Sequence, residues 1–355
     1  MVSGPQRATV IGTGLIGGSI GLALRAAGWN VTGVDVDNAA AERALELGAI
    51  DAVGIDPLAT ITFVAAPVRA IAAEVRRALA STTGVVTDVG SVKASVVAEI
   101  DDPRFVGGHP MAGSEQLGVD GANPSLFEGA VWVLTPVVGT DSDHFALVDT
   151  VVRSLGAEVV ALPPERHDAL VAVVSHVPHL TAAALMGLAN ERADEHAALL
   201  RLAAGGFRDM TRIAAGTPSI WPDICSENRD AIVEVIDRLT KELGRLRGLV
   251  AAGERTELLR TLETAQAARR NLPQRVVRPS EVAEVRIPVP DRDGVIAEVA
   301  TLASEMGINI ADLEVAHSSE GDRGVLILLV DTTKAEQYRL GLVERGYRPA
   351  VTYLD

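Results

Sequence analysis

A short stretch in the first half of the chain carries residue types suited to proton transfer. It reads Gly107-Gly108-His109-Pro110-Met111-Ala112-Gly113-Ser114-Glu115. Two glycines let a backbone bend sharply or approach a ligand closely, and an imidazole takes or shares a proton near neutral pH. Because residues 104–106 read as a strand, His109 is predicted at a strand's C-terminal end, where open α/β sheets bind ligands. The alternative is a loop histidine bonded to the backbone.

A glycine turn near the N-terminus has the spacing of a dinucleotide site. It follows an apolar run at 8–11 and precedes a helical pattern at 19–27. The first glycine allows a tight turn, the second lets the backbone reach a pyrophosphate, and the third lets the helix pack on the strand. N–H groups at the helix start then face the phosphate. The predicted cofactor-binding residues are Gly12, Gly14, Leu15, Ile16 and Gly17.

An acid follows the next predicted strand, residues 29–34, as a dinucleotide site requires. Asp35 would accept hydrogen bonds from the adenosine ribose hydroxyls and would repel a 2′-phosphate. Asp37 adds to that repulsion, and no arginine immediately follows the acid. The pattern favours NAD over NADP, with a ligand-free glycine turn as the alternative.

Further strand–helix units predict an α/β Rossmann-type domain over residues 1–163, with later strands at 61–66, 85–88, 131–134 and 158–162. Ser91 and Lys93 follow one of these strands, so they share the sheet edge of the glycine turn and His109. A helix N-cap and a surface charge are the alternatives for these two residues.

Residues 164–272 change to a helical period and predict an all-α domain. Pro178 interrupts this pattern, and a kink there would turn His176 or His179 toward a cleft. Two histidines at a structural kink are the alternative.

The stretch 205–212 holds two glycines and two arginines beside an acid, which predicts a helix break that presents a guanidinium. Arginine is well shaped for bidentate carboxylate binding, although surface arginines at a helix junction would fit too. A long helix is predicted from Trp221 to about residue 250, and a second at 254–268. Their apolar surface predicts an intertwined helical homodimer.

A linker at 273–280 precedes a small domain at 281–355 with a β–α–β–β–α–β pattern, typical of a ferredoxin-like unit. The pattern predicts strands at 284–289, 308–316, 324–330 and 350–353 and helices at 295–306 and 334–345.

The composition of the 355-residue chain excludes some classes of partner. A net charge of −15 argues against nucleic acid or an anionic membrane as the main partner. The single cysteine, Cys225, excludes an intrachain disulfide and a cysteine-rich metal site, and we expect no metal cofactor. Residues 1–7 and the glycine-broken run after them resemble neither a signal peptide nor a membrane span, so a cytoplasmic enzyme is expected.

Five sequence segments, which occur in the same order as in the family, give the chain a specific resemblance to the prephenate/arogenate dehydrogenase family of tyrosine biosynthesis. They lie at residues 12–19, 88–93, 107–115, 175–179 and 205–214 with Trp221. The tail resembles an ACT domain, a regulatory module that often binds amino acids, through residues 291–295 and 307–310.

The resemblance implies NAD-dependent oxidative decarboxylation of prephenate to 4-hydroxyphenylpyruvate, with arogenate as the alternative substrate. It implies that His109 accepts the proton of the ring hydroxyl and that Ser91 holds this hydroxyl in register. Arg212 would pair with a substrate carboxylate, and His179 would contact the side chain.

Further roles follow from the same resemblance. His176 would contact the substrate less directly, Glu115 would pair with an arginine across the dimer and gate the pocket, and Lys93 would support the nicotinamide or the serine. Gly294 and Asn309 lie where the tail would bind tyrosine or another aromatic amino acid as an effector. A tail that only mediates assembly is the alternative.

Two other classes of function compete with this prediction. A 3-hydroxyacid dehydrogenase would carry a catalytic lysine on its helical domain, and the first half of the helical region has none. A non-enzymatic NAD or amino-acid sensing regulator would usually carry a basic DNA-binding helix, which the charge of −15 disfavours.

Overall fold

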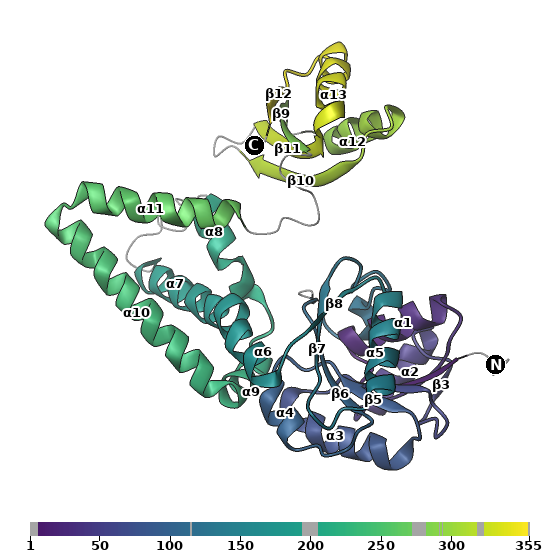
Figure 1. Cartoon of the computed structure of the whole chain (residues 1–355). Helices are drawn as coiled ribbons and strands as arrows, with labels where there is room; N and C mark the ends of the chain where they lie inside the picture. Colours follow the sequence, from purple (N-terminus) through teal and green to yellow (C-terminus); the bar gives the residue numbers. More distant parts are fainter. Residues whose placement is uncertain are drawn as a thin grey trace. The chain divides into compact units, whose positions relative to one another are not determined.

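The computed structural model describes residues 6–113, 116–193, 205–271, 282–290, 292, 294–317 and 323–353. The chain divides into two compact units, Met1–Leu188 with Thr211–Arg247 and Ala189–Met210 with Gly248–Asp355 (Figure 1). The first unit contains the large sheet and the side chains of the candidate site.

The first unit is built on an eight-stranded sheet of order β3-β2-β1-β4-β5-β6-β7-β8. All neighbouring strands are parallel except the antiparallel pair β6 and β7. The strands are β1 (Arg7–Ile11), β2 (Asn30–Val34), β3 (Ala52–Val53), β4 (Ile61–Val64), β5 (Val85–Asp88), β6 (Phe105–Pro110), β7 (Val131–Thr135) and β8 (Glu158–Ala161).

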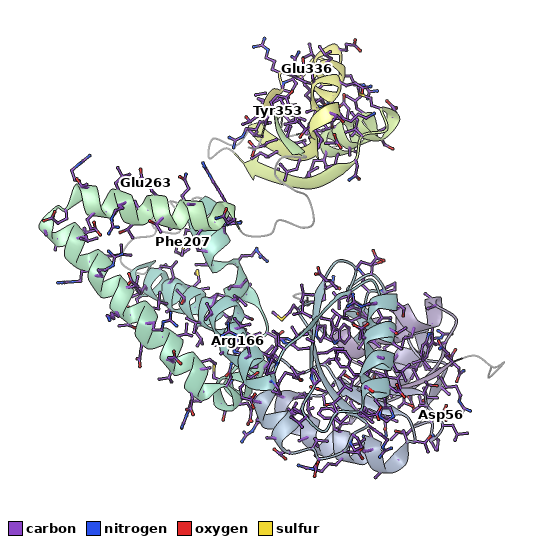
Figure 2. The ribbon with its side chains drawn as sticks, viewed as in Figure 1. Asp56, Arg166, Phe207, Glu263, Glu336 and Tyr353 are labelled. Atoms are coloured by element: carbon purple, nitrogen blue, oxygen red, sulfur yellow. The ribbon has the colours of Figure 1, made fainter. Side chains whose placement is uncertain are left out.

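Helices cover both faces of this sheet, and their side chains fill the space against it (Figure 2). One apolar cluster joins α1 and α5 to the sheet, and a second joins α3 and α4 to it. The helices are α1 (Leu15–Ala26), α2 (Asn38–Glu46), α3 (Val68–Ser81), α4 (Ala94–Ala98) and α5 (Ser142–Ser154). Burial on both faces explains the continuous apolar runs of the strands, and the predicted Rossmann-type arrangement is confirmed.

Two details of the sheet differ from the sequence prediction. The short strand β3 was not predicted, because two exposed residues give no apolar run. Strand β6 continues through Pro110, further than the predicted 104–106, and His109 lies near its C-terminal end as predicted.

The helical part of the first unit begins with α6 (Pro164–Val171), a π-helical turn (η2, Ala172–His176) and α7 (Val177–Ala193). The wide turn comes directly before Pro178, which agrees with the predicted kink. The predicted long helix from Trp221 is wrong: it is interrupted at Asn228, where α9 (Trp221–Glu227) ends before α10 (Arg229–Ala252).

The run Pro164–Glu191 is long and apolar enough to span a membrane by length and composition alone. It also carries the buried side chains of His167, Asp168 and His176, whose polar groups are satisfied by other parts of the chain. Such partners indicate a helix of a folded domain, whose apolar residues Leu170, Val173, Val174 and Leu188 are exposed in the single chain.

The second unit contains most of α8 (Gly205–Thr211), α11 (Arg255–Arg270) and a C-terminal domain. The predicted linker at 273–280 lies outside the described residues. The C-terminal domain has a four-stranded antiparallel sheet of order β10-β11-β9-β12. Its elements are β9 (Val282–Pro290), α12 (Val295–Glu305), β10 (Ile310–His317), β11 (Arg323–Asp331), α13 (Thr332–Glu344) and β12 (Ala350–Tyr353). This is the predicted β–α–β–β–α–β order.

Candidate active site

The glycine turn after β1 has the geometry that its sequence predicts. Gly12 has a φ of 91°, and a Cβ there would overlap the carbonyl oxygen of Ala65. A Cβ on Gly17 would overlap the carbonyl oxygen of Gly12, so the start of α1 packs directly on the turn. A Cβ on Gly14 would meet nothing within 4 Å, which leaves open space in front of the helix N-terminus. Leu15 is the first residue of α1, where backbone N–H groups lack helical partners.

Asp35 follows β2 and is tied to this turn. Its Oδ2 accepts a hydrogen bond from the backbone N–H of Thr13 at 2.7 Å, and its Oδ1 accepts from the N–H of Asp37 at 3.0 Å. The carboxylate is half-buried and retains accepting capacity, as a ribose-binding acid requires.

The two glycines before His109 serve close packing within the protein. A Cβ on Gly108 would lie 2.7 Å from the carbonyl oxygen of Asp88 and 3.0 Å from Nε1 of Trp132. A Cβ on Gly107 would overlap Oγ1 of Thr135. The bend that two glycines allow is not used, because both residues lie in regular strand.

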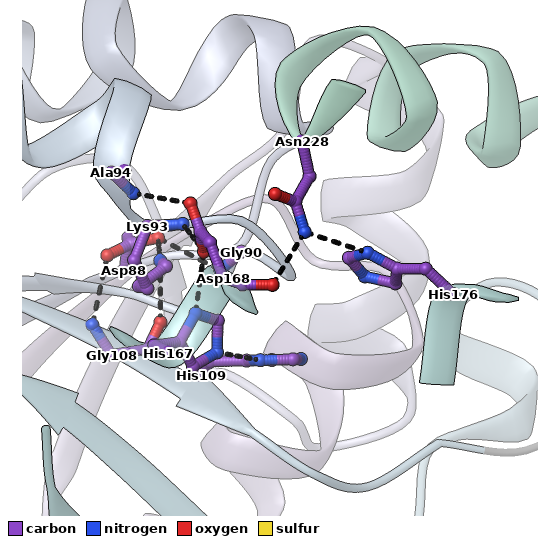
Figure 3. Close-up of polar contacts among 10 residues, drawn as sticks. All are labelled: Asp88, Gly90, Lys93, Ala94, Gly108, His109, His167, Asp168, His176 and Asn228. Atoms are coloured by element: carbon purple, nitrogen blue, oxygen red, sulfur yellow. Dashed lines mark hydrogen bonds and ion pairs between the residues drawn. The ribbon is translucent and has the colours of Figure 1, made fainter. Parts of the chain in front are cut away.

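His109 begins a hydrogen-bond relay that reaches into α6 (Figure 3). Its Nδ1 lies 2.8 Å from Nε2 of His167, and Nδ1 of His167 lies 2.7 Å from Oδ1 of Asp168. The Asp168 carboxylate also accepts from the backbone N–H groups of Lys93 and Ala94, each at 2.9 Å. His167 is fully buried, whereas His109 is partly exposed.

The direction of donation in this relay follows from the carboxylate, which only accepts. Nδ1 of His167 therefore carries a hydrogen, and a neutral His167 accepts at Nε2. Nδ1 of His109 then donates, so the lone pair of His109 lies at Nε2, on the side of the ring away from His167. This tautomer makes His109 a proton acceptor for a bound ligand.

The surroundings keep His109 neutral. Burial lowers the pKa of His109 well below the ordinary value of 6.5, and the nearby His167, the Lys93 cation and His176 act in the same direction. A neutral imidazole is the form that can act as a general base.

Lys93 follows β5, as predicted, and its side chain points into the protein. Its ammonium is completely buried, forms an ion pair with Asp88 and donates to the carbonyl oxygen of Gly108 at 2.8 Å. Burial lowers its pKa, and Asp88 opposes that shift. Lys93 thus contacts the strand that carries His109, and its predicted support of the nicotinamide or of Ser91 stays a prediction.

The histidines around Pro178 separate into two roles. His176 is 1% exposed, and its Nδ1 lies 3.1 Å from Nδ2 of Asn228, which also donates to the backbone carbonyl of Asp168 at 2.9 Å. His176 is thus held by another part of the chain, burial lowers its pKa to about 4, and its less direct role at the substrate stays a prediction. His179 stacks on Trp221, with ring centroids 3.6 Å apart and an angle of 14°.

The remaining predicted residues lie on separate segments. Ser91 is half-buried in the turn between β5 and α4. Arg212 begins a 3₁₀ turn (η4, Arg212–Ala215) and is exposed. Glu115 lies outside the described residues. In the C-terminal domain, Gly294 has a φ of 81° and lines a cavity of about 540 Å³, and the exposed Asn309 is not among the lining residues.

Three residues of the candidate site, His167, Asp168 and Asn228, were not predicted from the sequence. The sequence offered one indication, the adjacent polar residues His167 and Asp168 near the start of a predicted helix whose other face is apolar. Nothing in the sequence placed that pair against His109, because 58 residues separate the two histidines.

The fold and the site together define a class of protein. A glycine turn after β1, its acid after β2 and a neutral histidine near the end of β6 share the carboxyl edge of the parallel part of the sheet, as in nucleotide-dependent oxidoreductases. Two family models match, the prephenate dehydrogenase nucleotide-binding domain over residues 20–161 and its dimerization domain over residues 163–264.

Known proteins agree with these matches. A prephenate dehydrogenase of Bacillus subtilis is 34% identical over 348 residues, covering 92% of this chain and 93% of its own length. The structure of the Aquifex aeolicus prephenate dehydrogenase with hydroxyphenyl propionate and NAD+ has a TM-score of 0.71 and 31% identity and covers 77% of this chain and 100% of its own. The Synechocystis arogenate dehydrogenase follows with a TM-score of 0.65, 30% identity and coverage of 74% and 99%. The chain belongs to the prephenate dehydrogenase family and is an oxidoreductase.

Proposed function

We propose that the chain catalyses the NAD-dependent oxidative decarboxylation of prephenate to 4-hydroxyphenylpyruvate. The observation that carries the proposal is the relay from Asp168 through His167, which leaves the Nε2 lone pair of a neutral His109 at the sheet edge of the glycine turn. Family membership supplies the substrate class, and the site supplies the base.

The residues of the glycine turn fit NAD. The open space at Gly14 and the N–H groups at Leu15 and Ile16 would hold the pyrophosphate, and Asp35 would accept from the adenosine ribose. The carboxylates of Asp35 and Asp37 disfavour a 2′-phosphate. When bound, NAD supplies the hydride acceptor.

The chain's own residues would handle the proton of the substrate ring hydroxyl. Nε2 of His109 accepts this proton, and the new positive charge is stabilised by His167 and the Asp168 carboxylate. Ser91 would hold the hydroxyl in register with the imidazole. Loss of carbon dioxide needs little acid catalysis, since the ring becomes aromatic.

We assign the remaining substrate contacts by residue type and position. Arg212 would pair with a substrate carboxylate, because a guanidinium binds carboxylates in a bidentate manner. His179, stacked on Trp221, would contact the three-carbon side chain. Glu115 would pair with an arginine across a dimer and gate the pocket.

Turnover with purified protein tests the proposal. Prephenate and NAD should give NADH and 4-hydroxyphenylpyruvate, followed by absorbance and product analysis, and arogenate in place of prephenate should react more slowly. No NADH with either substrate would contradict the enzyme function, and faster turnover of arogenate would reassign the substrate.

We also propose a cytoplasmic homodimer formed by a helical domain at 164–272, after an NAD-binding domain at 1–163. The exposed apolar residues on α7, α10 and α11 support this assembly, among them Leu188, Leu243, Val250, Leu259 and Leu262. The matched family model describes this region as a dimerization domain. Sedimentation should give twice the mass of the chain, and a monomer at micromolar concentration would contradict the proposal.

We propose that the C-terminal domain, residues 281–355 after a linker at 273–280, is an ACT-like regulatory domain of the ferredoxin-like type. Its strand order and its apolar cavity at the start of α12 support an amino-acid effector near Gly294 and Arg292. Tyrosine should inhibit the full-length enzyme and not a form lacking this domain. Identical kinetics of both forms with tyrosine would favour a role in assembly alone.

A further inference from the structure

A fully buried ion pair adjoins the strand that carries the candidate base. Asp88 ends β5 and Lys93 precedes α4, and neither side chain has exposed surface. The Lys93 ammonium donates to Asp88 Oδ2 and, at 2.8 Å, to the carbonyl oxygen of Gly108. Lysine is rare here: only three of the 32 lysines and arginines are lysines, and the other two, Lys241 and Lys334, are exposed.

The ion pair forms the hydrogen bonds to the backbone of Gly108 that a neighbouring strand would otherwise form. The ladder between β5 and β6 ends where Thr87 pairs with Val106, and β6 then continues against β7 alone. Beyond that point the N–H of Gly108 donates to Asp88 Oδ1 at 3.1 Å, and its carbonyl accepts from Lys93. Both backbone groups of the residue before His109 are thus satisfied by the pair.

Asp88 and Lys93 also form hydrogen bonds with the turn that carries Ser91 and with the relay of His109. Asp88 Oδ2 accepts from the N–H of Gly90 at 2.9 Å, one residue before Ser91. The backbone N–H of Lys93 donates to Asp168 Oδ1 at 2.9 Å. The ion pair therefore holds the backbone next to both candidate catalytic residues, through Gly90 and Gly108, and the backbone of Lys93 binds the carboxylate that orients the base (Figure 3).

We propose that Lys93 is a positioning residue for the reaction: together with Asp88 it fixes the backbone on which Ser91 and His109 stand, and it contacts neither cofactor nor substrate. The inference rests on the proposed function, because it assumes that these two residues meet the substrate hydroxyl. A compact ammonium suits this place, since a guanidinium is larger and its donors diverge in a planar fork.

The pair also sets the charge around His109. His109 is influenced by Lys93, by His167 from α6 and by His176 from η2. The Lys93 cation disfavours a second positive charge beside it, while the carboxylates of Asp88 and Asp168 prevent an excess of positive charge in the buried site. Lys93 therefore helps to keep the imidazole in its neutral, proton-accepting form.

The test compares full-length Lys93→Met, the double variant Asp88→Asn/Lys93→Met and the control Lys334→Met. Each variant is measured for kcat and KM with prephenate, Kd for NAD, melting temperature, and the pKa of His109 by NMR. The His109 signal is assigned by its loss in His109→Asn.

We expect Lys93→Met to lower kcat about 100-fold, the effect of a small misplacement of a catalytic group, with the Kd for NAD unchanged. The pKa of His109 should rise, because a neighbouring cation is removed. Lys93→Met should also melt at lower temperature, since it leaves a buried carboxylate unpaired. The double variant should regain much of that loss but keep the low kcat, because nothing replaces the bond to the carbonyl of Gly108. Lys334→Met should resemble the wild type.

Two results would overturn the proposal. A weaker Kd for NAD with unchanged kcat at saturating NAD would place Lys93 on the cofactor. A folded double variant with wild-type kcat would show that the pair has no positioning role, even if Lys93→Met alone does not fold. The NMR titration needs no turnover. A wild-type protein inactive on prephenate would contradict the proposed function and leave this test of Lys93 intact, because an unchanged pKa of His109 in Lys93→Met would still count against the proposal.

Discussion

Replacing Asp168 by Asn should invert the relay that prepares His109. The carboxylate accepts three hydrogen bonds, from His167 Nδ1 and from the backbone N–H groups of Lys93 and Ala94. An amide has a single accepting oxygen, so its NH₂ group stands either in place of Oδ2, against the N–H of Ala94, or in place of Oδ1, against His167 and the N–H of Lys93. If it faces His167, that ring becomes an acceptor at Nδ1 and donates from Nε2. His109 then carries its hydrogen on Nε2, where the substrate proton should go.

The loss should approach that of the general base itself. General-base catalysis contributes about 10² to 10⁴ in rate, so we expect Asp168→Asn to lower kcat about 10³-fold, roughly 4 kcal/mol of transition-state stabilisation. Steady-state NADH formation with prephenate measures the loss. The Kd for NAD should not change, because Asp168 lies on α6, apart from the glycine turn and Asp35. Asp149→Asn on the exposed face of α5 is the matched control. Asp168→Ala leaves His167 Nδ1 no acceptor at this position, and a folded Asp168→Ala protein with wild-type kcat would refute the relay.

Three further predictions follow from the same contacts. Gly108→Ala should lower kcat and should lower the free energy of unfolding by about 1–3 kcal/mol, because its Cβ would lie 2.7 Å from the carbonyl oxygen of Asp88. The control Gly139→Ala should change neither quantity, because a Cβ there meets nothing within 4 Å. The pKa of His176 is about 4 in the folded protein and 6.5 in the unfolded chain, so the unfolded chain takes up a proton first as the pH falls below 6.5. The free energy of unfolding should therefore fall by about 3 kcal/mol between pH 6.5 and pH 4 through this group. Denaturant unfolding of His176→Gln should show a smaller fall in the free energy of unfolding between pH 7 and pH 4, and an equal fall would contradict the assignment. Asp35→Ala should weaken NAD binding about tenfold, the value of a charge-assisted hydrogen bond, and narrow the preference for NAD over NADP; an unchanged preference in competition assays would count against its role.

The sequence predicted those parts of the fold in which neighbouring residues by themselves indicate that a segment is buried. Strands β1, β4 and β5 are covered on both faces and are therefore continuous apolar runs. The glycine turn was predictable for a similar reason, since Gly12 and Gly17 are places where no side chain fits. The break at Asn228 has no such signal, because the hydrogen bonds of its side chain go to Asp168 and His176, which are distant in the sequence.

The candidate site was predictable only in part, because its key contacts join distant segments. Residue type identified His109 as a base, but the partner that sets its tautomer comes from α6. Lys93 followed a strand and suggested a ligand contact, whereas its burial depends on the carboxylate of Asp88. A lysine is buried only where an opposite charge meets it, and this partnership is a property of the folded chain.

The central claim is that His109 accepts the proton of the substrate hydroxyl, and His109→Asn tests it most directly. Asparagine is close in size and cannot take up a proton. The measurement is kcat for NADH formation from prephenate at saturating NAD, with the Kd for NAD determined on the same protein. The account predicts a fall in kcat of about 10² to 10⁴ with the Kd for NAD nearly unchanged. A wild-type kcat, or a comparable loss of NAD binding, would contradict it.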